Sequence, residues 1–375
     1  MSLSRRSFLR NVGVGAAAAG AVSALPLSES LLFAAEPPRA PRPGGPILLN
    51  SNENAYGAFS SVHAAMQQGL SVCNRYPDDD HFCERVAALH KVKPEQVLAG
   101  CGSTEVLKIA ASAFTGPGKK LVMASPTFEA LGAYARAGGA EVERVPLAPS
   151  FAHDLDAMLA AAGSDAGLVY ICNPNNPTAS LTPRSDLETF LKKLPAGVVV
   201  LMDEAYHHFV DSPEYTSFLD RPVDDERMLV ARTFSKVYGL AGARLGYSVT
   251  SRKLTEAMRP HRLFDSGNQM ALHGALAALE DSTAMHAAVQ RNAADREEFQ
   301  RQARARKVTT VPSQANFLMV KTGRPVREVI AHFRQQNILV GRPFPPMETY
   351  LRVSLGRPAE MQAFWKAWDQ MPRIQ

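Results

Sequence analysis

Three short polar stretches each come directly after an apolar run, and their side chains are of types that take part in chemistry. The runs Leu168 to Cys172, Val198 to Met202 and Met228 to Thr233 lead into Asn173-Pro174-Asn175-Asn176-Pro177-Thr178, Asp203-Glu204-Ala205-Tyr206 and Ser235-Lys236. Amides, a carboxylate and an amine can hold a small ligand and exchange protons with it. By itself, Lys236 is better explained as a solvated loop residue, so a catalytic role depends on its neighbours.

The elements that carry these residues follow the rhythm of a parallel sheet. Short apolar runs alternate with alanine-rich helical stretches, which predicts an α/β fold with a mostly parallel sheet. The carboxyl ends of parallel strands share one edge, where such sheets bind ligands. We therefore expect Asn176, Asp203 and Lys236 to meet at that edge.

A fourth stretch, Gly100-Cys101-Gly102-Ser103-Thr104-Glu105, precedes the apolar helical segment VLKIAASAF. Glycine allows the backbone to approach a ligand closely, and free amides at a helix start suit a phosphate. Many such loops are only turns. The chain also supplies an arginine after the third stretch. Arg244 lies eight residues after Lys236, beyond a glycine-rich loop.

Length and composition indicate an enzyme-sized chain, and they argue against a nucleic-acid-binding protein and against a cysteine-based metal site. The 375 residues, 46% of them hydrophobic, are enough for one large or two medium domains. The net charge is +5, but the basic residues are dispersed, which argues against a nucleic-acid partner. The cysteines at 73, 83, 101 and 172 lack metal-ligand spacing, so we expect no metal site. A Cys73–Cys83 bridge stays open, with free thiols favoured.

The first residues have the pattern of an export signal. Ser4-Arg5-Arg6-Ser7-Phe8-Leu9-Arg10 resembles a twin-arginine motif and is followed by an apolar run of roughly 15 residues, shorter than the roughly 20 that span a bilayer. We expect residues 1–35 to be a signal peptide and linker read by the twin-arginine export machinery, without a stable membrane anchor, and the mature chain to be periplasmic. Cleavage after Ala24, Ala34 or Ala35 stays open. The leader carries three arginines and one glutamate, so the mature net charge is +3.

The ordered set of motifs is more specific than any single one. From about Leu48 to Gly356 the chain carries LNSNENAYG, GCGSTE, SPTFEA, NPNNPT, DEAY, TFSK with GARLGY, and YLRVSLG. In this set it resembles the fold-type I pyridoxal-phosphate enzymes, specifically the class I/II aminotransferases and most closely the histidinol-phosphate aminotransferase-like branch. The resemblance implies an aspartate aminotransferase-like fold, with a three-layer large domain, a smaller α+β domain, and pyridoxal 5'-phosphate as cofactor.

The resemblance also assigns the cofactor ring contacts. Lys236 would form the Schiff base with the cofactor aldehyde, and Asp203 would keep the ring nitrogen protonated so that the ring withdraws electrons. A salt bridge from Asp203 to a nearby arginine is the alternative. Asn176 and Tyr206 would contact the phenolic oxygen, with Tyr206 counted among the catalytic residues. Phe128 would stack on the ring, unless it is an ordinary core phenylalanine.

The phosphate contacts implied by the resemblance come from two segments. Arg244 would clamp the phosphate from the glycine-rich loop. The other expected phosphate ligands are Thr233, Ser235, Gly102, Ser103 and Thr104.

Substrate contacts are expected from both ends of the chain. In YLRVSLG, alternation places Leu351 and Val353 on one face and Arg352 on the other, so Arg352 suits the substrate α-carboxylate, as the family also implies. A solvent-exposed arginine on an edge strand is the alternative. Arg342 matches a family arginine that binds a distal phosphate, so we expect a substrate with an anionic or polar distal group. The neighbouring PFPPM could equally line an apolar pocket. Asn52 and Tyr56 match a segment that crosses a dimer interface, where the tyrosine touches the neighbour's cofactor phosphate. A homodimer with shared active sites follows from the resemblance alone.

Two departures from the family pattern stand out. Ala179 replaces a usual glycine, which should alter the turn without removing a catalytic group. The proline-rich surroundings of Arg342 and the export signal argue against a role in cytoplasmic histidine biosynthesis. Twin-arginine export carries folded proteins, which suits a chain that must acquire a cytoplasmic cofactor before it leaves.

We therefore predict transfer of an amino group between an amino acid or amine donor and a 2-oxo acid, with Lys236 as base and acid. A pyridoxal-phosphate decarboxylase, lyase or oxidase remains an alternative, because the cofactor assists the breaking of several bonds. An exported non-catalytic binding protein is a more remote one. We expect a large cofactor domain over residues 76–264 and a small domain that combines 46–75 with 265–375.

Overall fold

The computed structural model describes residues 45–222 and 225–372. The expected twin-arginine signal over residues 1–35, with its cleavage sites, lies outside the described residues. Within the described ranges, no helix is both long and apolar enough to cross a bilayer.

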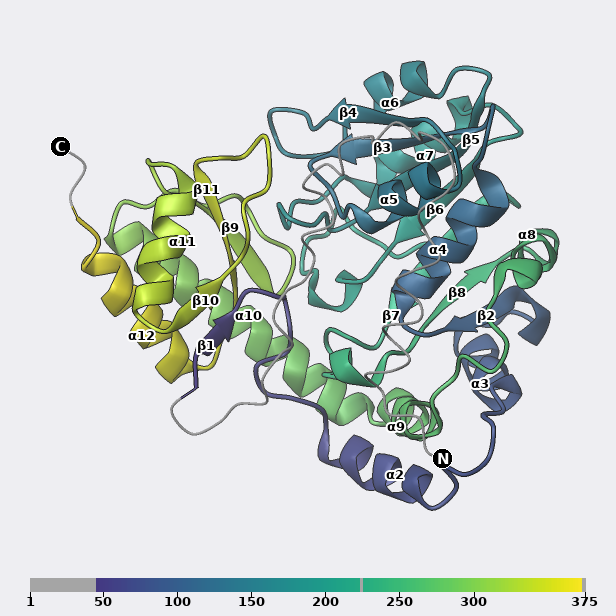
Figure 1. The fold of residues 1–375 in the computed structure, drawn as a ribbon, viewed down its shortest axis with the longest axis horizontal. Helices are drawn as coiled ribbons and strands as arrows, with labels where there is room; N and C mark the ends of the chain where they lie inside the picture. Colours follow the sequence, from purple (N-terminus) through teal and green to yellow (C-terminus); the bar gives the residue numbers. More distant parts are fainter. Residues whose placement is uncertain (1–44, 223–224, 373–375) are drawn as a thin grey trace, which may run out of the picture. The chain divides into compact units, whose positions relative to one another are not determined.

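A seven-stranded sheet forms the centre of the fold, in the order β2-β8-β7-β6-β5-β3-β4 (Figure 1). Its strands are β2 (Val97–Gly100), β3 (Lys120–Ser125), β4 (Val142–Pro146), β5 (Ala166–Cys172), β6 (Val199–Asp203), β7 (Met228–Thr233) and β8 (Gly246–Thr250). Neighbouring strands run parallel except for β8, which is antiparallel to both β7 and β2. The expected mostly parallel sheet is confirmed.

The reversed direction of β8 decides which chain ends meet. Its first residue, Gly246, pairs with the last residue of β2, Gly100, and with the last residue of β7, Thr233. One edge of the sheet therefore collects the carboxyl ends of β2, β5, β6 and β7 together with the amino end of β8. Arg244, two residues before β8, is brought to this edge by that reversal.

Helices cover both faces of the sheet because the central strands are apolar on both sides. In β5, Leu168 and Tyr170 face one layer while Val169 and Ile171 face the other. The first layer contains α4 (Ser103–Phe114), α5 (Ala130–Ala137) and α8 (Arg252–Met258). The second contains α2 (Ser60–Leu70), α3 (Asp80–His90), α6 (Leu155–Ala162), α7 (Arg184–Lys193) and α9 (Gln269–Glu280). The short helical turns are η2 (Pro94–Gln96), η3 (His207–Phe209), η4 (Ala241–Ala243) and η5 (Arg259–His261).

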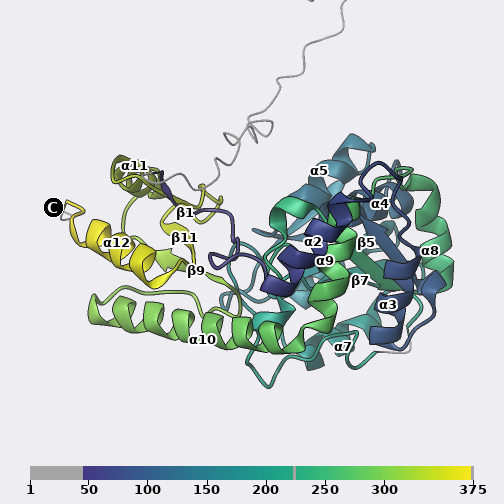
Figure 2. The ribbon, with the colours of Figure 1, turned by 90° about the horizontal axis from the view of Figure 1, so that it is seen from below.

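Four further strands form two small sheets. In the first, β1 (Ile47–Leu49) pairs in parallel with β10 (Ile338–Val340), and in the second β9 (Phe317–Lys321) pairs antiparallel with β11 (Tyr350–Ser354). They share a core with α10 (Ser282–Ala305), α11 (Val326–Gln335) and α12 (Pro358–Asp369), which lie against them in Figure 2. The large sheet falls within the expected 76–264 and the small sheets within 46–75 and 265–375. The boundaries themselves stay a prediction.

Candidate active site

A cavity of about 320 Å³ opens at the edge where the strand ends meet. This volume lies within the usual range of small-ligand sites. The residues expected from the sequence that line it are Asn52, Ser103, Thr104, Phe128, Asn176, Asp203, Tyr206, Thr233, Ser235, Lys236, Arg244 and Arg352. The structure thus brings together side chains spread over three hundred positions of sequence.

Lys236 is partly buried in this cavity, directly after β7. Its Nζ donates to the backbone oxygen of Asn52 at 3.2 Å and lies 5.4 Å from the centre of the Tyr206 ring. Burial, assisted by the charge of Arg352, lowers the pKa of Lys236 to about 8. Part of the amine is therefore uncharged near neutral pH, which is the nucleophilic form.

Asp203 ends β6 and is buried. Because Cys172 and Asp203 are in register, Tyr170 lies on the same side of the sheet, and its hydroxyl donates to Oδ2 of Asp203 at 2.9 Å. The backbone amide of Ala205 donates to Oδ1 at 3.1 Å. Burial raises the pKa of Asp203 to about 6, and both hydrogen bonds oppose this shift. The side chain is therefore a carboxylate above a pH of about 6.

The adjacent Glu204 points to the face of the sheet opposite Asp203, so the two consecutive acids have different partners. Its carboxylate lies 2.8 Å from Arg232 and accepts a hydrogen bond from Ser217 at 2.7 Å. The arginine salt bridge considered as an alternative for Asp203 is thus made by Glu204. Among the described residues, Asp203 forms no ion pair.

Tyr170 was missed by the sequence interpretation. It is fully buried in β5 and is the one hydroxyl in the run Leu168 to Cys172. The signal was present, since period-two alternation puts a tyrosine two residues before a strand end on the same side as that end. The identity of its partner required the register between β5 and β6.

One end of the cavity is built to receive an anion. Gly102 has φ of 76°, and a Cβ at this position would overlap the guanidinium of Arg244. Arg244 donates from Nη1 to the backbone oxygen of Ala241 at 2.8 Å and to Oγ of Ser235 at 3.4 Å. The Thr233 hydroxyl donates to Ser235 at 3.0 Å, and α4 begins at Ser103. This places an arginine, two hydroxyls and a helix start in one group, with no ion pair to Arg244 among the described residues.

The other end of the cavity contains a second arginine. Arg352 is buried on the side of β11 opposite Leu351, as the alternation predicts. Its Nη1 donates to Oδ1 of Asn176 at 2.6 Å and its Nη2 to the backbone oxygen of Asn50 at 2.7 Å, while its buried Nε has no partner within the described chain. No described carboxylate pairs with it. A buried cation with this environment is suited to an anionic ligand.

Asn52 connects Lys236 to the tyrosine at the cavity wall. Its side-chain amide donates to the Tyr206 hydroxyl at 3.1 Å, and its backbone amide donates to Oγ of Ser354 at 2.8 Å. Burial raises the pKa of Tyr206, so this side chain remains a phenol that can donate a hydrogen bond. Asn52 thus belongs to this chain's own cavity.

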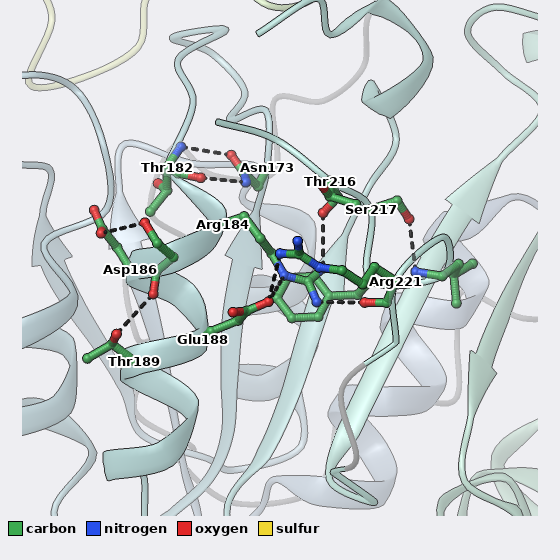
Figure 3. Close-up of polar contacts among 12 residues, drawn as sticks. Asn173, Thr182, Arg184, Asp186, Glu188, Thr189, Thr216, Ser217 and Arg221 are labelled. Atoms are coloured by element: carbon green, nitrogen blue, oxygen red, sulfur yellow. Dashed lines mark hydrogen bonds and ion pairs between the residues drawn. The ribbon is translucent and has the colours of Figure 1, made fainter. Parts of the chain in front are cut away.

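The loop that carries Asn176 is closed by a reciprocal pair shown in Figure 3. Asn173 donates to the backbone oxygen of Thr182, and the Thr182 amide donates back to the Asn173 side chain, both at 3.0 Å. Ala179, within this loop, is fully buried with φ of 59°, a conformation that glycine adopts more readily. The departure at Ala179 removes no polar group from the cavity.

Three expected site residues are outside the cavity lining: Gly102, which lies against Arg244 of that lining, Tyr56 and Arg342. The Tyr56 hydroxyl donates to Asp295 of the same chain at 3.0 Å, beside a separate small cavity, and its expected contact with a partner's cofactor stays a prediction. Arg342 is exposed and pairs with Glu129 at 2.7 Å. All four cysteines carry free thiols, including Cys172 in the cavity wall.

Comparison with known proteins agrees with this geometry. Residues 45–367 match the family model of class I and II aminotransferases. The histidinol-phosphate aminotransferase of Shouchella clausii is 36% identical over 85% of this chain and 87% of its own length, and histidinol-phosphate aminotransferase 2 of Methylococcus capsulatus is 34% identical over 87% and 90%. A solved histidinol-phosphate aminotransferase from Sinorhizobium meliloti, in complex with pyridoxal-5'-phosphate, superposes with a TM-score of 0.80 at 26% identity over 86% of this chain and 89% of its own.

The mostly parallel seven-stranded sheet, with the Lys236 cavity at its edge, is the architecture of an aminotransferase-type α/β enzyme. The chain belongs to the class I and II aminotransferase family. The expected family, fold class and enzyme class are confirmed.

Proposed function

We propose that this chain transfers an amino group between an amino acid or amine donor and a 2-oxo acid, with pyridoxal 5'-phosphate as cofactor. The observation that carries the proposal is one cavity holding a lysine of lowered pKa, a buried carboxylate, and two arginines without an acidic partner in the described chain. The names of the relatives support the same reaction class and the same cofactor.

The residues present fit this cofactor. The group around Gly102 and Arg244 suits a phosphate, Asp203 suits a protonated ring nitrogen, and Phe128 lines the wall where a ring would stack. Lys236 supplies the amine that reacts with an aldehyde. When bound, the cofactor withdraws electrons from the substrate Cα and makes its proton acidic.

The chain's own groups then have distinct tasks. Lys236 accepts a proton from the substrate Cα at Nζ and returns it during the exchange. Asp203 holds a proton on the ring nitrogen, and Tyr170 orients the carboxylate that does so. Arg352 orients the substrate through its α-carboxylate with a charge-assisted pair of hydrogen bonds. Tyr206 and Asn176 line the same cavity, and the contacts that they make there leave a hydroxyl and an amide able to donate hydrogen bonds to the cofactor ring.

A panel of amino donors with 2-oxo acids, assayed on purified holoenzyme, tests the reaction type. We expect the 2-oxo acid to be converted into its amino acid with one equivalent of donor consumed. Release of carbon dioxide or ammonia without amino-group exchange would instead indicate a decarboxylase, a lyase or an oxidase. Absence of any turnover across the panel would favour a binding protein.

Arg352→Ala should weaken every donor that has an α-carboxylate. Losing hydrogen bonds to a charged group costs about 1.5–3 kcal/mol, so we expect kcat/KM to fall roughly 10- to 150-fold, mostly through KM. Arg301, exposed on α10 and paired with Glu298, offers a matched control as Arg301→Ala. Unchanged KM values in Arg352→Ala would remove this arginine from substrate binding.

Tyr170→Phe should move the acidic limb of the pH profile. The Tyr170 hydroxyl stabilises ionised Asp203, so its loss raises the Asp203 pKa, and the carboxylate is lost at higher pH. We expect the acidic limb of kcat/KM to shift upward in pH, with KM nearly constant. Tyr215→Phe is the matched control, because the Tyr215 hydroxyl is buried without a partner in the described chain. Identical profiles for both variants would show that Tyr170 is only structural.

We further propose a homodimer. Phe264 is 99% exposed and Tyr76 is 82% exposed. Their segments lie side by side, because Gln269 donates to the Tyr76 backbone oxygen at 3.1 Å and Arg262 pairs with Asp79. Exposed apolar groups gathered in this way favour a protein partner. Sedimentation equilibrium should give twice the chain mass, and a monomer mass at micromolar concentration would contradict the proposal.

Export by the twin-arginine machinery to the periplasm is also proposed. It is supported by the stretch Ser4 to Arg10 and the apolar run after it. Fractionation of cells should recover the active enzyme from the periplasm. Recovery of all activity in the cytoplasm would contradict the proposal.

A further inference from the structure

An ion pair near the cavity connects the segment between β10 and β11 with the segment between β3 and α5. Nη2 of Arg342, in the segment between β10 and β11, lies 2.7 Å from Oε2 of Glu129, which precedes α5. The two side chains are 41% and 37% exposed. Glu129 directly follows Phe128, which lines the cavity, so the pair borders the site.

One aromatic ring connects this pair to the substrate arginine. The guanidinium carbon of Arg342 lies 4.3 Å from the centre of the Phe344 ring, and that of Arg352 lies 4.7 Å from the same centre. Phe344 is buried. A substrate whose α-carboxylate binds Arg352 therefore has the Arg342–Glu129 pair one ring away, in reach of a group at the far end of its side chain.

We infer that Glu129 determines donor specificity: by pairing with Arg342 it favours donors whose side chain ends in an uncharged aromatic or polar group and disfavours those that end in a phosphate. The inference rests on the proposed function. A phosphate that bound Arg342 would have to displace the Glu129 carboxylate from it. The phosphate would then lie next to that carboxylate, which carries the same sign of charge. Two like charges about 4 Å apart repel enough to lower binding on the order of 10-fold or more.

The surrounding charges make Glu129 more influential than an isolated surface acid. Burial and the charge of Arg136 lower the pKa of Arg144, and Glu129 opposes that shift, so the charge of Glu129 also acts on Arg144. Its removal would take away the carboxylate that pairs with Arg342 and the favourable charge that acts on Arg144. Because Glu129 pairs with Arg342 in this chain, we infer that a distal phosphate binds there less well than the family resemblance implies.

The inference can be tested by binding, without turnover. The probes are 3-(4-hydroxyphenyl)propanoate and its phosphate ester, which share the carboxylate for Arg352 and differ only at the distal end. Dissociation constants are measured on holoenzyme by calorimetry. In the wild type we expect the ester to bind at least about 10-fold more weakly than the phenol. In Glu129→Gln the ester should tighten by a similar factor, while the phenol changes less than about 3-fold.

Two further variants separate the possible causes. In Glu129→Gln combined with Arg342→Ala, the gain for the ester should disappear, because the arginine that Glu129 restrains is absent. Glu141→Gln, an acid-to-amide change at an exposed position before β4, should leave both constants unchanged. Stronger binding of the ester than the phenol in the wild type, or equal effects of Glu129→Gln on both probes, would overturn the inference. Failure of amino-group transfer with the expected binding pattern would overturn the proposed function alone.

Discussion

Replacing Lys236 with alanine is expected to abolish amino-group transfer and to remove the covalent bond that borohydride fixes between cofactor and protein. Lys236 is the lysine in the cavity wall, and its lowered pKa of about 8 provides an uncharged amine. In the wild type, the rate of cofactor attachment should rise with pH through about 8, because the neutral amine is the attacking form. Lys236→Ala should show no attachment at any pH.

The non-covalent contacts predict what the variant keeps. Arg244, Ser235 and the start of α4 remain, so we expect Lys236→Ala to retain cofactor that dialysis removes slowly. Lys321→Ala, at an exposed end of β9, is the control and should react like the wild type. Mass spectrometry after borohydride reduction locates the modified residue. A cofactor adduct on another lysine in Lys236→Ala would show that the assignment is wrong.

Replacing Asp203 with alanine is expected to lower the rate of α-proton removal by at least about 100-fold, the lower end of the loss seen when one preorganised charge-stabilising group is removed from an active site. The variant removes the carboxylate that we propose keeps the ring nitrogen protonated. The free energy of unfolding should change little in Asp203→Ala. Burial already disfavours the Asp203 charge and raises the pKa of Asp203 to about 6, so the carboxylate contributes little to stability. The wild type should itself lose activity as the pH falls through the range where Asp203 becomes protonated.

Proton removal is measured by the exchange of deuterium from the substrate Cα in a single turnover, and stability by thermal unfolding of the cofactor-free chain. Asp203→Asn keeps the shape and the hydrogen bond from Ala205 but cannot hold the charge, so it should be nearly as slow as Asp203→Ala. The matched position is Glu204, which lies on the opposite face with Arg232. Glu204→Gln should reduce stability more than rate. Near-normal exchange in Asp203→Ala would rule out the proton-holding role.

Family, fold class and most of the cavity could be predicted from the amino-acid sequence because they depend on local rules. Polar residues at the ends of parallel strands must share an edge, so Asn176, Asp203 and Lys236 could be grouped without coordinates. Alternation within a strand placed Arg352 opposite Leu351 in the same way. The order of the motifs then identified the family, since each motif marks one junction of the same fold.

Tertiary structure alone decided the partners of these residues. Tyr170 meets Asp203 because β5 and β6 pair in one register, and Glu129 meets Arg342 because two segments more than two hundred residues apart pack at the rim. The reversed strand β8 likewise brings Arg244 against Gly102. Such contacts depend on how whole elements pack, and a shift of one residue in register would turn a side chain to the other face. Local pattern therefore determined which groups carry the chemistry, while packing decided which neighbours tune their charge and restrict the substrate.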